Sequence, residues 1–208
     1  MVIAVAAYLL GSIPTGYLVA RARGIDIRAV GSGNIGATNV FRMVGIMAGV
    51  FALVVDGLKG YAACTWLCDW VLTLLGSPTT NTELCRILAG LTAVLGHNFT
   101  CWLRFRGGKG IATSAGAYFA LAPLAAGIAL GMWIIVLALG RYVSVASIAA
   151  AVALPTAVWL TPNSLTLRIV TTALGLLAIC KHKGNIQRLL NGTERRLGQP
   201  SATPEATK

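Results

Sequence analysis

The chain has 208 residues, of which 56% are hydrophobic and only 11% charged, and its mean hydropathy is +0.76. Soluble domains carry about 25% charged residues, so this composition excludes an ordinary soluble protein. The net charge of +11 does not indicate a nucleic-acid partner, because RNA readers need exposed basic and aromatic surface on a water-soluble fold. In a membrane protein the same charge reports topology and contact with anionic headgroups. We expect an all-α polytopic membrane protein whose partner is the lipid bilayer.

Apolar segments follow one another along the chain. They comprise residues 2–20, 43–75, 85–103, 111–139, 142–160 and 164–180. Each approaches or exceeds the ~20 residues that cross a ~30 Å hydrocarbon core. The first segment has no basic residue before it and is interrupted by Pro14 and Gly16. We therefore interpret it as a retained span rather than a signal peptide.

Basic residues cluster between these segments, and the clusters set the expected orientation. They are Arg21, Arg23, Arg28 and Arg42, then Arg104, Arg106 and Lys109, then Lys181, Lys183, Arg188, Arg195 and Arg196. The stretch from Asp69 to Glu83 has no Lys or Arg. By the positive-inside rule the clusters are cytoplasmic and that stretch is outside, which puts the N-terminus outside and the C-terminus in the cytoplasm.

The number of crossings between Lys109 and Lys181 must be even, yet three apolar segments stand there. The first, residues 111–139, has 29 residues, and at 1.5 Å each these reach ~43 Å, which is too long for one upright span. Pro123 can divide it into two short helices. The division gives about seven transmembrane helices in all. The count falls to five if one segment is re-entrant or interfacial.

The rest of the chain adds few further features. Residues 1–198 are expected to form one membrane domain, and the polar residues 199–208 a disordered cytoplasmic tail. Cys64 and Cys68 lie four apart, but the spacing of a metal site is missing, so we expect buried thiols, no metal and no cofactor. Within "DGLKG", Asp56 and Lys59 share a helix face. They can form a structural ion pair, or Lys59 can face an anionic substrate.

The stretch "GSGNIGATNVFR" combines backbone freedom with hydrogen-bond donors and a cation. Gly31, Gly33 and Gly36 allow successive N–H groups to converge on an anion. The neutral donors are Ser32, Asn34, Thr38 and Asn39, and Arg42 adds a guanidinium suited to phosphate. The spacing fits neither a P-loop nor a dinucleotide fingerprint. The alternative is a flexible loop rich in turn formers.

Two further stretches have the same character. In "GHNFTCWLRFRGGKGIAT", Gly107, Gly108 and Gly110 surround Lys109 just before a helical run, where free N–H groups favour an anion. The single histidine of this stretch, His97, is more typical of a hydrogen-bonded structural residue than of a catalyst.

The third stretch, "KHKGNIQRLLNGTERRLG", places His182, Asn185 and Arg188 at helical spacing on one face, with Glu194 beyond them. Lys181 and Lys183 can be the basic flank of the last span. The three stretches together predict a site for phosphorylated substrates at the cytosolic surface, open to the bilayer. Such a site suits group transfer between a lipid-like donor and a soluble phosphate ester. An organic-phosphate transporter or channel is the rival interpretation.

These motifs resemble those of the bacterial acyl-phosphate:glycerol-3-phosphate acyltransferase family (PlsY). The resemblance rests on "GSIPTGYLVAR", "GSGNIGATNVFR", "DGLKG", "GHNFTCWLRFRGGKGIAT" and "HKGNIQRLLNGTERRLG", in that order, from about residue 11 to 198. It implies an inner-membrane enzyme with seven helices and a cytoplasmic active site. The implied reaction moves a fatty acyl group from acyl phosphate to the 1-hydroxyl of glycerol 3-phosphate. The products are lysophosphatidic acid and inorganic phosphate, in the first step of phospholipid synthesis.

The resemblance also assigns residues. It gives catalytic roles to Ser32, Arg42, Lys109, His182 and Asn185, a phosphate-binding role to the glycines of the second motif, and a structural role to Glu194. We expect the backbone N–H groups of the first motif, with Ser32, to hold the phosphate of acyl phosphate. The residues expected to clamp glycerol 3-phosphate are Arg42, Lys109, His182 and Asn185, and Lys59 is a further expected cation. Either His182 or a phosphate oxygen takes the hydroxyl proton, and an acyl-enzyme on Ser32 is a further alternative. A monomer is expected, and "GHNFT" replaces the family's usual "GHxFP".

Overall fold

The computed structural model describes residues 1–74, 76 and 82–199. Within these residues the chain is helical and forms no strand. In chain order the elements are α1 (Val2–Ser12), α2 (Thr15–Arg21), α3 (Ala37–Met43), α4 (Ile46–Ala62), the π-helix η1 (Ala63–Leu67), α5 (Cys68–Leu74), α6 (Thr82–Asn98), the 3₁₀-helix η2 (Cys101–Leu103), α7 (Ile111–Leu121), α8 (Pro123–Gly140), α9 (Val143–Leu160), α10 (Leu165–Lys181) and α11 (Lys183–Leu190).

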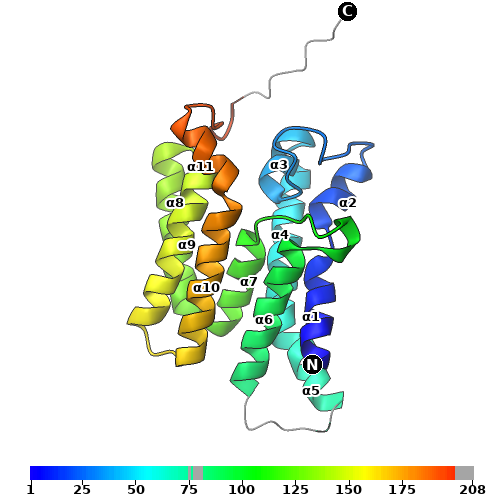
Figure 1. Ribbon diagram of the computed structural model, residues 1–208, viewed down its shortest axis with the longest axis vertical. Helices are drawn as coiled ribbons and strands as arrows, with labels where there is room; N and C mark the ends of the chain where they lie inside the picture. The colour runs from blue at the N-terminus through cyan, green and yellow to red at the C-terminus, as the bar shows by residue number, and fades with distance from the viewer. Residues whose placement is uncertain (75, 77–81, 200–208) are drawn as a thin grey trace, which may run out of the picture.

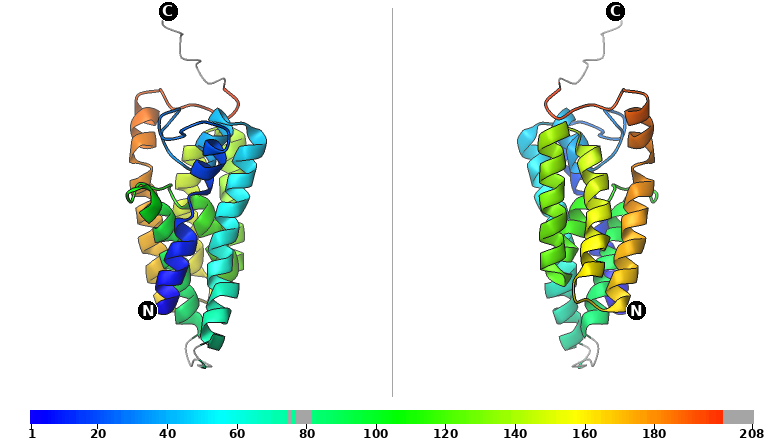
Figure 2. Two further views of the ribbon diagram at one scale, coloured as in Figure 1. Left: turned by 90° about the vertical axis from the view of Figure 1, so that its right-hand side faces the viewer. Right: turned by 90° about the vertical axis from the view of Figure 1, so that its left-hand side faces the viewer.

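The long helices lie side by side in two groups (Figure 1). One group contains α1, α4 and α6, the other contains α8, α9 and α10, and α7 lies between them. Contacts between α1 and α6, α4 and α7, and α8 and α9 hold neighbouring helices together. The two side views show that all of these helices run along the long axis of the molecule (Figure 2). The predicted all-helical membrane architecture is confirmed.

Five helical segments are long and apolar enough to cross a membrane: Val2–Arg21, Ile46–Leu74, Thr82–Leu103, Pro123–Gly140 and Val143–Leu160. A sixth candidate is the pair α10 and α11, bent by 51°. The helix α7 is apolar but has only 11 residues. As expected, the chain divides at Pro123, because α7 ends at Leu121 and α8 begins at the proline. The total of seven spans stays a prediction.

Glycines let α4 and α7 approach closely. A Cβ atom at Gly60 would overlap the carbonyl of Thr113, and one at Gly116 would overlap the carbonyl of Gly57. Small residues of this kind allow membrane helices to pack backbone against backbone. The contact therefore fixes α7, and the loop that precedes it, against α4.

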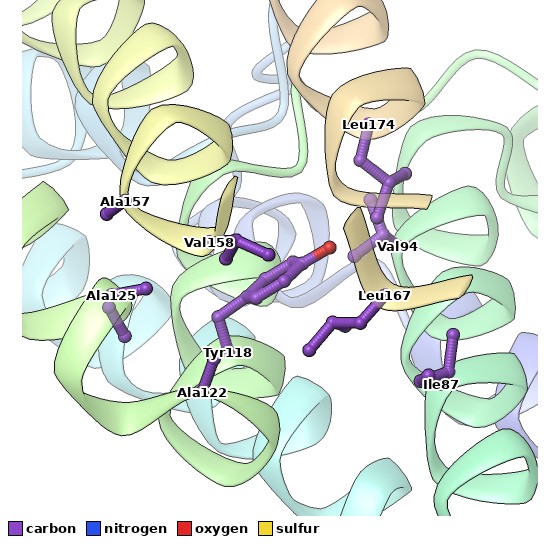
Figure 3. Close-up of a cluster of buried hydrophobic side chains, with 10 residues drawn as sticks. Ile87, Val94, Tyr118, Ala122, Ala125, Ala157, Val158, Leu167 and Leu174 are labelled. Atoms are coloured by element: carbon purple, nitrogen blue, oxygen red, sulfur yellow. The ribbon is translucent and has the colours of Figure 1, made fainter. Parts of the chain in front are cut away.

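A buried cluster centred on Tyr118 joins α7 to the second group of helices. The ring of Tyr118 lies beside Val158 of α9 and Leu167 of α10 (Figure 3), and the side chain is 1% exposed. Leu174 of α10 and Val94 of α6 complete its surroundings. Because four helices meet at this ring, the cluster holds them together beneath the polar end of the molecule.

The three basic stretches meet at one end of the bundle. The loop before α3, the loop between α6 and α7, and the segment that contains α11 all lie toward the same end of the bundle (Figure 1). The N-terminus lies toward the opposite end. Residues 200–208 of the predicted tail (199–208), and residues 75 and 77–81 of the stretch between Asp69 and Glu83, lie outside the described residues.

Candidate active site

A cavity of about 270 Å³ lies where the three stretches meet. Its polar wall includes Ser32, Asn34, Thr38, Asn39, Arg42, Asp56, His97, Lys109, His182, Asn185 and Glu194. Its other wall is apolar and is formed by residues of α7 to α10, among them Ile111, Leu130, Trp133, Leu154 and Leu174. One continuous space therefore offers cations and hydrogen-bond donors at one end and hydrocarbon at the other.

The first stretch is folded around the side chain of Asn39, which is 3% exposed. Its Oδ1 accepts a hydrogen bond from the backbone N–H of Ser32 at 3.0 Å, and its Nδ2 donates to the carbonyls of Ile27, Val30 and Asn34. Gly31 has a φ of +61°, and a Cβ there would overlap Asn39 Oδ1. Asn39 thus shapes the loop and also lines the cavity, together with Ser32 and Arg42.

Asn34 and Gly36 form the turn that starts α3. The Oδ1 of Asn34 accepts the N–H of Gly36 at 2.9 Å, and both residues line the cavity together with Ala37 and Thr38. Gly33 has a φ of +68° and does not line the cavity. The members of the first motif therefore divide into cavity walls and residues that give the loop its shape.

In the second stretch His97, Lys109 and Gly110 reach the cavity. Gly110 has a φ of +79° and precedes α7, whose first residues, Ile111 and Ala112, also line it. Gly107 and Gly108 instead pack against the end of α6. Their N–H groups donate to the carbonyls of Asn98 and His97 at 3.2 and 3.0 Å. These two glycines hold the loop against the end of α6, and Lys109 follows them in the chain.

Lys109 is tied to the third stretch. Its ammonium donates a hydrogen bond to Asn185 Oδ1. Burial lowers the pKa of Lys109 to about 8, and the positive charges of Arg188 and Arg42 add to the effect, while Glu194 opposes it. The ammonium is consequently still charged at neutral pH.

Glu194 organises this part of the cavity. Its Oε1 accepts hydrogen bonds from Ser144 at 2.8 Å and Asn185 at 2.7 Å, and its Oε2 pairs with Arg188 at 2.8 Å. Burial raises the pKa of Glu194, but these hydrogen bonds outweigh burial and lower it. The carboxylate is therefore ionised and has three partners, which fits the expected structural role.

His182 is a neutral imidazole in this site. Its Nδ1 lies 2.7 Å from the carbonyl oxygen of Ala178, and because a carbonyl can only accept, Nδ1 carries the proton. The lone pair is then on Nε2. Burial and, to a smaller extent, the charge of Lys109 lower the pKa of His182 to about 4.

Arg42 stands between two cavities. It lines the main cavity and a second one of about 180 Å³, which also contains Arg188 and Arg195. Its Nη2 donates to the carbonyl of Arg195 at 3.0 Å. Burial lowers the pKa of Arg42, but the guanidinium stays charged at any physiological pH.

Lys59 is placed differently from the expected substrate cation. It is 5% exposed and lines neither cavity. Its ammonium lies 2.8 Å from Asp56 Oδ1, 3.0 Å from the carbonyl oxygen of Ile13 and 2.9 Å from His97 Nδ1. These contacts fit the ion-pair alternative, and a substrate contact of Lys59 stays a prediction.

Several cavity residues escaped the sequence reasoning. Tyr118, Trp133, Ser144 and Ser147 line the cavity from α7, α8 and α9, but they lie inside apolar segments where no polar motif marks them. The spacing of Ser144 and Ser147 is the one available signal, because two hydroxyls three residues apart share a helix face. Ser147 accepts a hydrogen bond from Trp133 Nε1 at 3.3 Å.

A multi-pass helical protein whose cavity joins a cationic end to a hydrocarbon end has the architecture of a membrane-embedded group-transfer enzyme. Comparison with known proteins makes this specific. The family model described as glycerol-3-phosphate acyltransferase matches residues 1–192. The chain is 43% identical to the glycerol-3-phosphate acyltransferase of Geotalea daltonii, over 93% of this chain and 95% of that one. It is 47% identical to the enzyme of Desulforudis audaxviator, over 91% of each chain.

Solved structures agree. A crystal structure of PlsY (YgiH), an integral membrane glycerol 3-phosphate acyltransferase in its glycerol 3-phosphate form, is similar with a TM-score of 0.84 and 36% identity, covering 95% of this chain and 94% of that one. Its lysophosphatidic acid form gives a TM-score of 0.81 and 35% identity, with the same coverage. The chain belongs to the glycerol-3-phosphate acyltransferase family. It is an acyltransferase, and the comparisons do not support the transporter alternative.

Proposed function

We propose that this protein transfers a fatty acyl group from acyl phosphate to the 1-hydroxyl of glycerol 3-phosphate. Its products are lysophosphatidic acid and inorganic phosphate, and the reaction begins phospholipid synthesis. One observation carries the proposal: the same cavity joins the cations Arg42 and Lys109 to the apolar wall around Trp133 and Leu154. A phosphate group and an acyl chain each find a matching surface there, and both belong to an acyl phosphate.

The proposed transfer needs no covalent enzyme intermediate. The hydroxyl oxygen attacks the acyl carbonyl carbon, a new ester C–O bond forms, and the bond from that carbon to the phosphate oxygen breaks. Acyl phosphate is a mixed anhydride and is already activated. The protein therefore has to orient the two substrates and neutralise phosphate charge, and orientation alone can supply on the order of 7–11 kcal/mol.

The proposed roles follow from the contacts. Arg42 and Lys109 hold phosphate oxygens, and Arg42 can do so with two parallel hydrogen bonds. The hydroxyl and backbone of Ser32 contact the phosphate of the donor, with the first residues of α3 beside it. Asn185 fixes Lys109, and Glu194 fixes Asn185. His182 offers its Nε2 as a hydrogen-bond acceptor to the hydroxyl of glycerol 3-phosphate.

A phosphate oxygen is the better proton acceptor. With a pKa of about 4, His182 is a weak base. The second pKa of a phosphate ester is about 6, so a phosphate oxygen takes the hydroxyl proton more readily. Among the described residues no base is hydrogen-bonded to Ser32 Oγ, which argues against an acyl-enzyme at that position. The proton then leaves with the inorganic phosphate.

The proposed orientation follows the charge distribution. Seven crossings put the N-terminus outside and the polar site and the C-terminus in the cytoplasm of a bacterial inner membrane. The proposed working unit is a monomer with one membrane domain over residues 1–198.

The test uses purified protein in lipid vesicles with acyl phosphate and radiolabelled glycerol 3-phosphate. We expect labelled lysophosphatidic acid and inorganic phosphate in equal amounts. Activity with an acyl-coenzyme A but not with acyl phosphate would overturn the choice of donor. Exchange of glycerol 3-phosphate across sealed vesicles without release of phosphate would overturn the reaction altogether.

A further inference from the structure

A cluster of buried ionisable residues adjoins the cavity, which two of its three members line, and it has no part in the chemistry described above. It consists of Asp56 and Lys59 of α4 and His97 near the end of α6, which are 2%, 5% and 6% exposed. Charges in a membrane helix are costly, and where they occur they usually have a function. The question is what this cluster holds in place.

The hydrogen bonds define the state of His97. A lysine ammonium can only donate, so Nδ1 of His97, 2.9 Å from Lys59 Nζ, is an acceptor. The proton of the neutral ring is therefore on Nε2. Asp56 Oδ1 lies 2.8 Å from Lys59 and 3.6 Å from His97 Nδ1. The ion pair thus keeps Lys59 charged and keeps the ring of His97 in one orientation.

The other edge of this ring faces the loop that carries Lys109. A Cβ atom at Gly108 would overlap His97 Nε2, so only a glycine fits against the ring. The backbone adds to the contact, because the N–H of Gly108 donates to the carbonyl of His97 at 3.0 Å. The next residue along the chain is Lys109. The position of the His97 ring consequently sets the position from which the Lys109 side chain starts.

The end of α6 also binds the last span. The carbonyl of Asn98 accepts hydrogen bonds from the N–H of Gly107 at 3.2 Å and from Lys181 Nζ at 3.0 Å. The Lys59 ammonium reaches the carbonyl of Ile13, at the break between α1 and α2. The cluster therefore ties the α1–α2 break, α4 and α6 to the loop that carries Lys109, and the adjoining carbonyl of Asn98 adds α10.

We infer that Asp56, Lys59 and His97 are positioning residues. They hold the Gly107–Gly110 loop where Lys109 can reach the phosphate of the substrate. The inference rests on the proposed role of Lys109 in binding glycerol 3-phosphate. It assigns the cluster an effect on that substrate through Lys109, although Asp56 and His97 also line the cavity.

The main test compares His97→Asn with His97→Ala and with the pair Asp56→Asn and Lys59→Met made together. His97→Asn keeps an oxygen near the place of Nδ1 but removes the ring edge that meets Gly108. The double substitution removes both charges at once and leaves no unpaired buried ion. For each folded variant we expect the KM for glycerol 3-phosphate to rise about ten- to hundredfold through misplacement of Lys109, with kcat and the KM for acyl phosphate changed less.

The matched control is Ser12→Ala. Ser12 is fully buried, and its hydroxyl donates to the carbonyl of Gly96, the residue before His97, at 3.3 Å. It touches the same turn of α6 without touching the loop. We expect its KM for glycerol 3-phosphate to stay within about twofold, because a single long hydrogen bond has a small net effect. Melting temperature and elution volume identify variants that have not folded.

A double-mutant cycle separates positioning from general damage. In a Lys109→Ala background, His97→Asn should add no further rise in the KM for glycerol 3-phosphate, since the residue through which it acts is gone. Additive effects would overturn the inference, and so would an unchanged KM in folded His97→Asn. An unchanged KM in Lys109→Ala itself would overturn the proposed role of Lys109 and the inference together, which distinguishes the two failures.

Discussion

At the residue scale, the site depends on cations whose charge is preserved although they are buried. Glu194 neutralises part of the field of Arg42, Arg188 and Lys109, and its own three hydrogen bonds keep it ionised. Without this carboxylate the positive charges would repel one another in an environment of low dielectric constant. Its partners Ser144 and Asn185 come from different elements, so the carboxylate also joins α9 to α11.

The lowered pKa of Lys109 predicts an alkaline limit to activity. The ammonium is charged below about pH 8 and neutral above it, so binding of the phosphate weakens as pH rises through that value. We expect kcat/KM for glycerol 3-phosphate to fall above about pH 8, because this ratio reports ionisations of the free enzyme and substrate. In Lys109→Arg the fall should move to higher pH, because a guanidinium keeps its charge there.

The matched control for this change is Lys183→Arg, since Lys183 is exposed and lines neither cavity. Its profile should follow that of the unmodified protein. An alkaline limb at the same pH in Lys109→Arg would show that another group titrates. The measurement is the initial rate over the range from about pH 6 to 10 at low glycerol 3-phosphate.

A second residue-scale prediction concerns His182. Removal of a general base costs about 10²–10⁴-fold in rate. If a phosphate oxygen accepts the proton, His182→Gln should lower kcat at saturating substrate by less than about hundredfold and raise the KM for glycerol 3-phosphate instead. Steady-state kinetics with both substrates varied provide the measurement. A loss of kcat in the upper part of that range, with KM unchanged, would restore His182 as the base.

The sequence could identify these residues more readily than their roles. The clusters of Gly, Asn and basic residues predicted an anion site, and most of their polar members line one cavity. Asn39 and Lys59 also lie in motifs expected to bind substrate, yet the side chains of both form hydrogen bonds with other groups of the protein. Whether a donor is free for a ligand depends on partners far along the chain, which no local pattern reveals.

At the element scale, the position of α7 depends on its contact with α4. The sequence predicted a break at Pro123 from length alone, because 29 apolar residues are too many for one upright span. It could not predict the close approach of Gly60 to Thr113. That approach depends on which helices are neighbours in space, and long-range packing decides which helices these are.

This contact predicts a contrast between two glycines of the same helix. A Cβ at Gly60 overlaps a carbonyl of α7, whereas one at Gly57 has its nearest neighbour at 3.6 Å, an ordinary contact. Gly60→Ala should therefore push α7 away and destabilise the protein by about 1–3 kcal/mol. Because Lys109 precedes α7, catalytic activity should fall too.

Gly57→Ala serves as the control for that prediction. Alanine is favoured over glycine inside a helix by about 1 kcal/mol, so this variant should be as stable as the unmodified protein or slightly more so. Melting temperature in detergent and kcat/KM for glycerol 3-phosphate measure the two effects. Equal behaviour of the two variants would contradict the account of the α4–α7 contact.

At the scale of the whole molecule, the two ends of the bundle differ in chemistry. The polar end carries the cavity and three basic stretches. Arg86 and Arg168 lie on α6 and α10, and both are engaged, Arg86 with Asp69 and Arg168 with the carbonyl of Thr161. Positive charge in loops is thus concentrated at the polar end, which is why charge counting alone sufficed to bring the three motifs together.

Exposed aromatic side chains mark both ends of the bundle. Trp66 and Trp70 are 68% and 61% exposed near one end of the α4–α5 segment, and Trp102 and Phe105 are 64% and 63% exposed beside the polar loops. Aromatic residues of this kind settle at the two membrane interfaces. The polar loops therefore stand at one interface, and the cavity extends from it toward the hydrocarbon.

The orientation of the bundle can be tested by cysteine labelling. The test starts from a variant in which the five native cysteines are replaced by alanine, and it adds either Pro162→Cys or Asn191→Cys. Both positions are exposed, and α10 separates them. If the site is cytoplasmic, a membrane-impermeant maleimide should label Pro162→Cys in spheroplasts and should label Asn191→Cys only after the membrane is permeabilised. The reverse pattern would invert the proposed orientation. Labelling of both positions from the same side would mean that α10 does not cross the membrane, which would contradict the seven-span count. As a control, retained acyltransferase activity shows that each variant is folded.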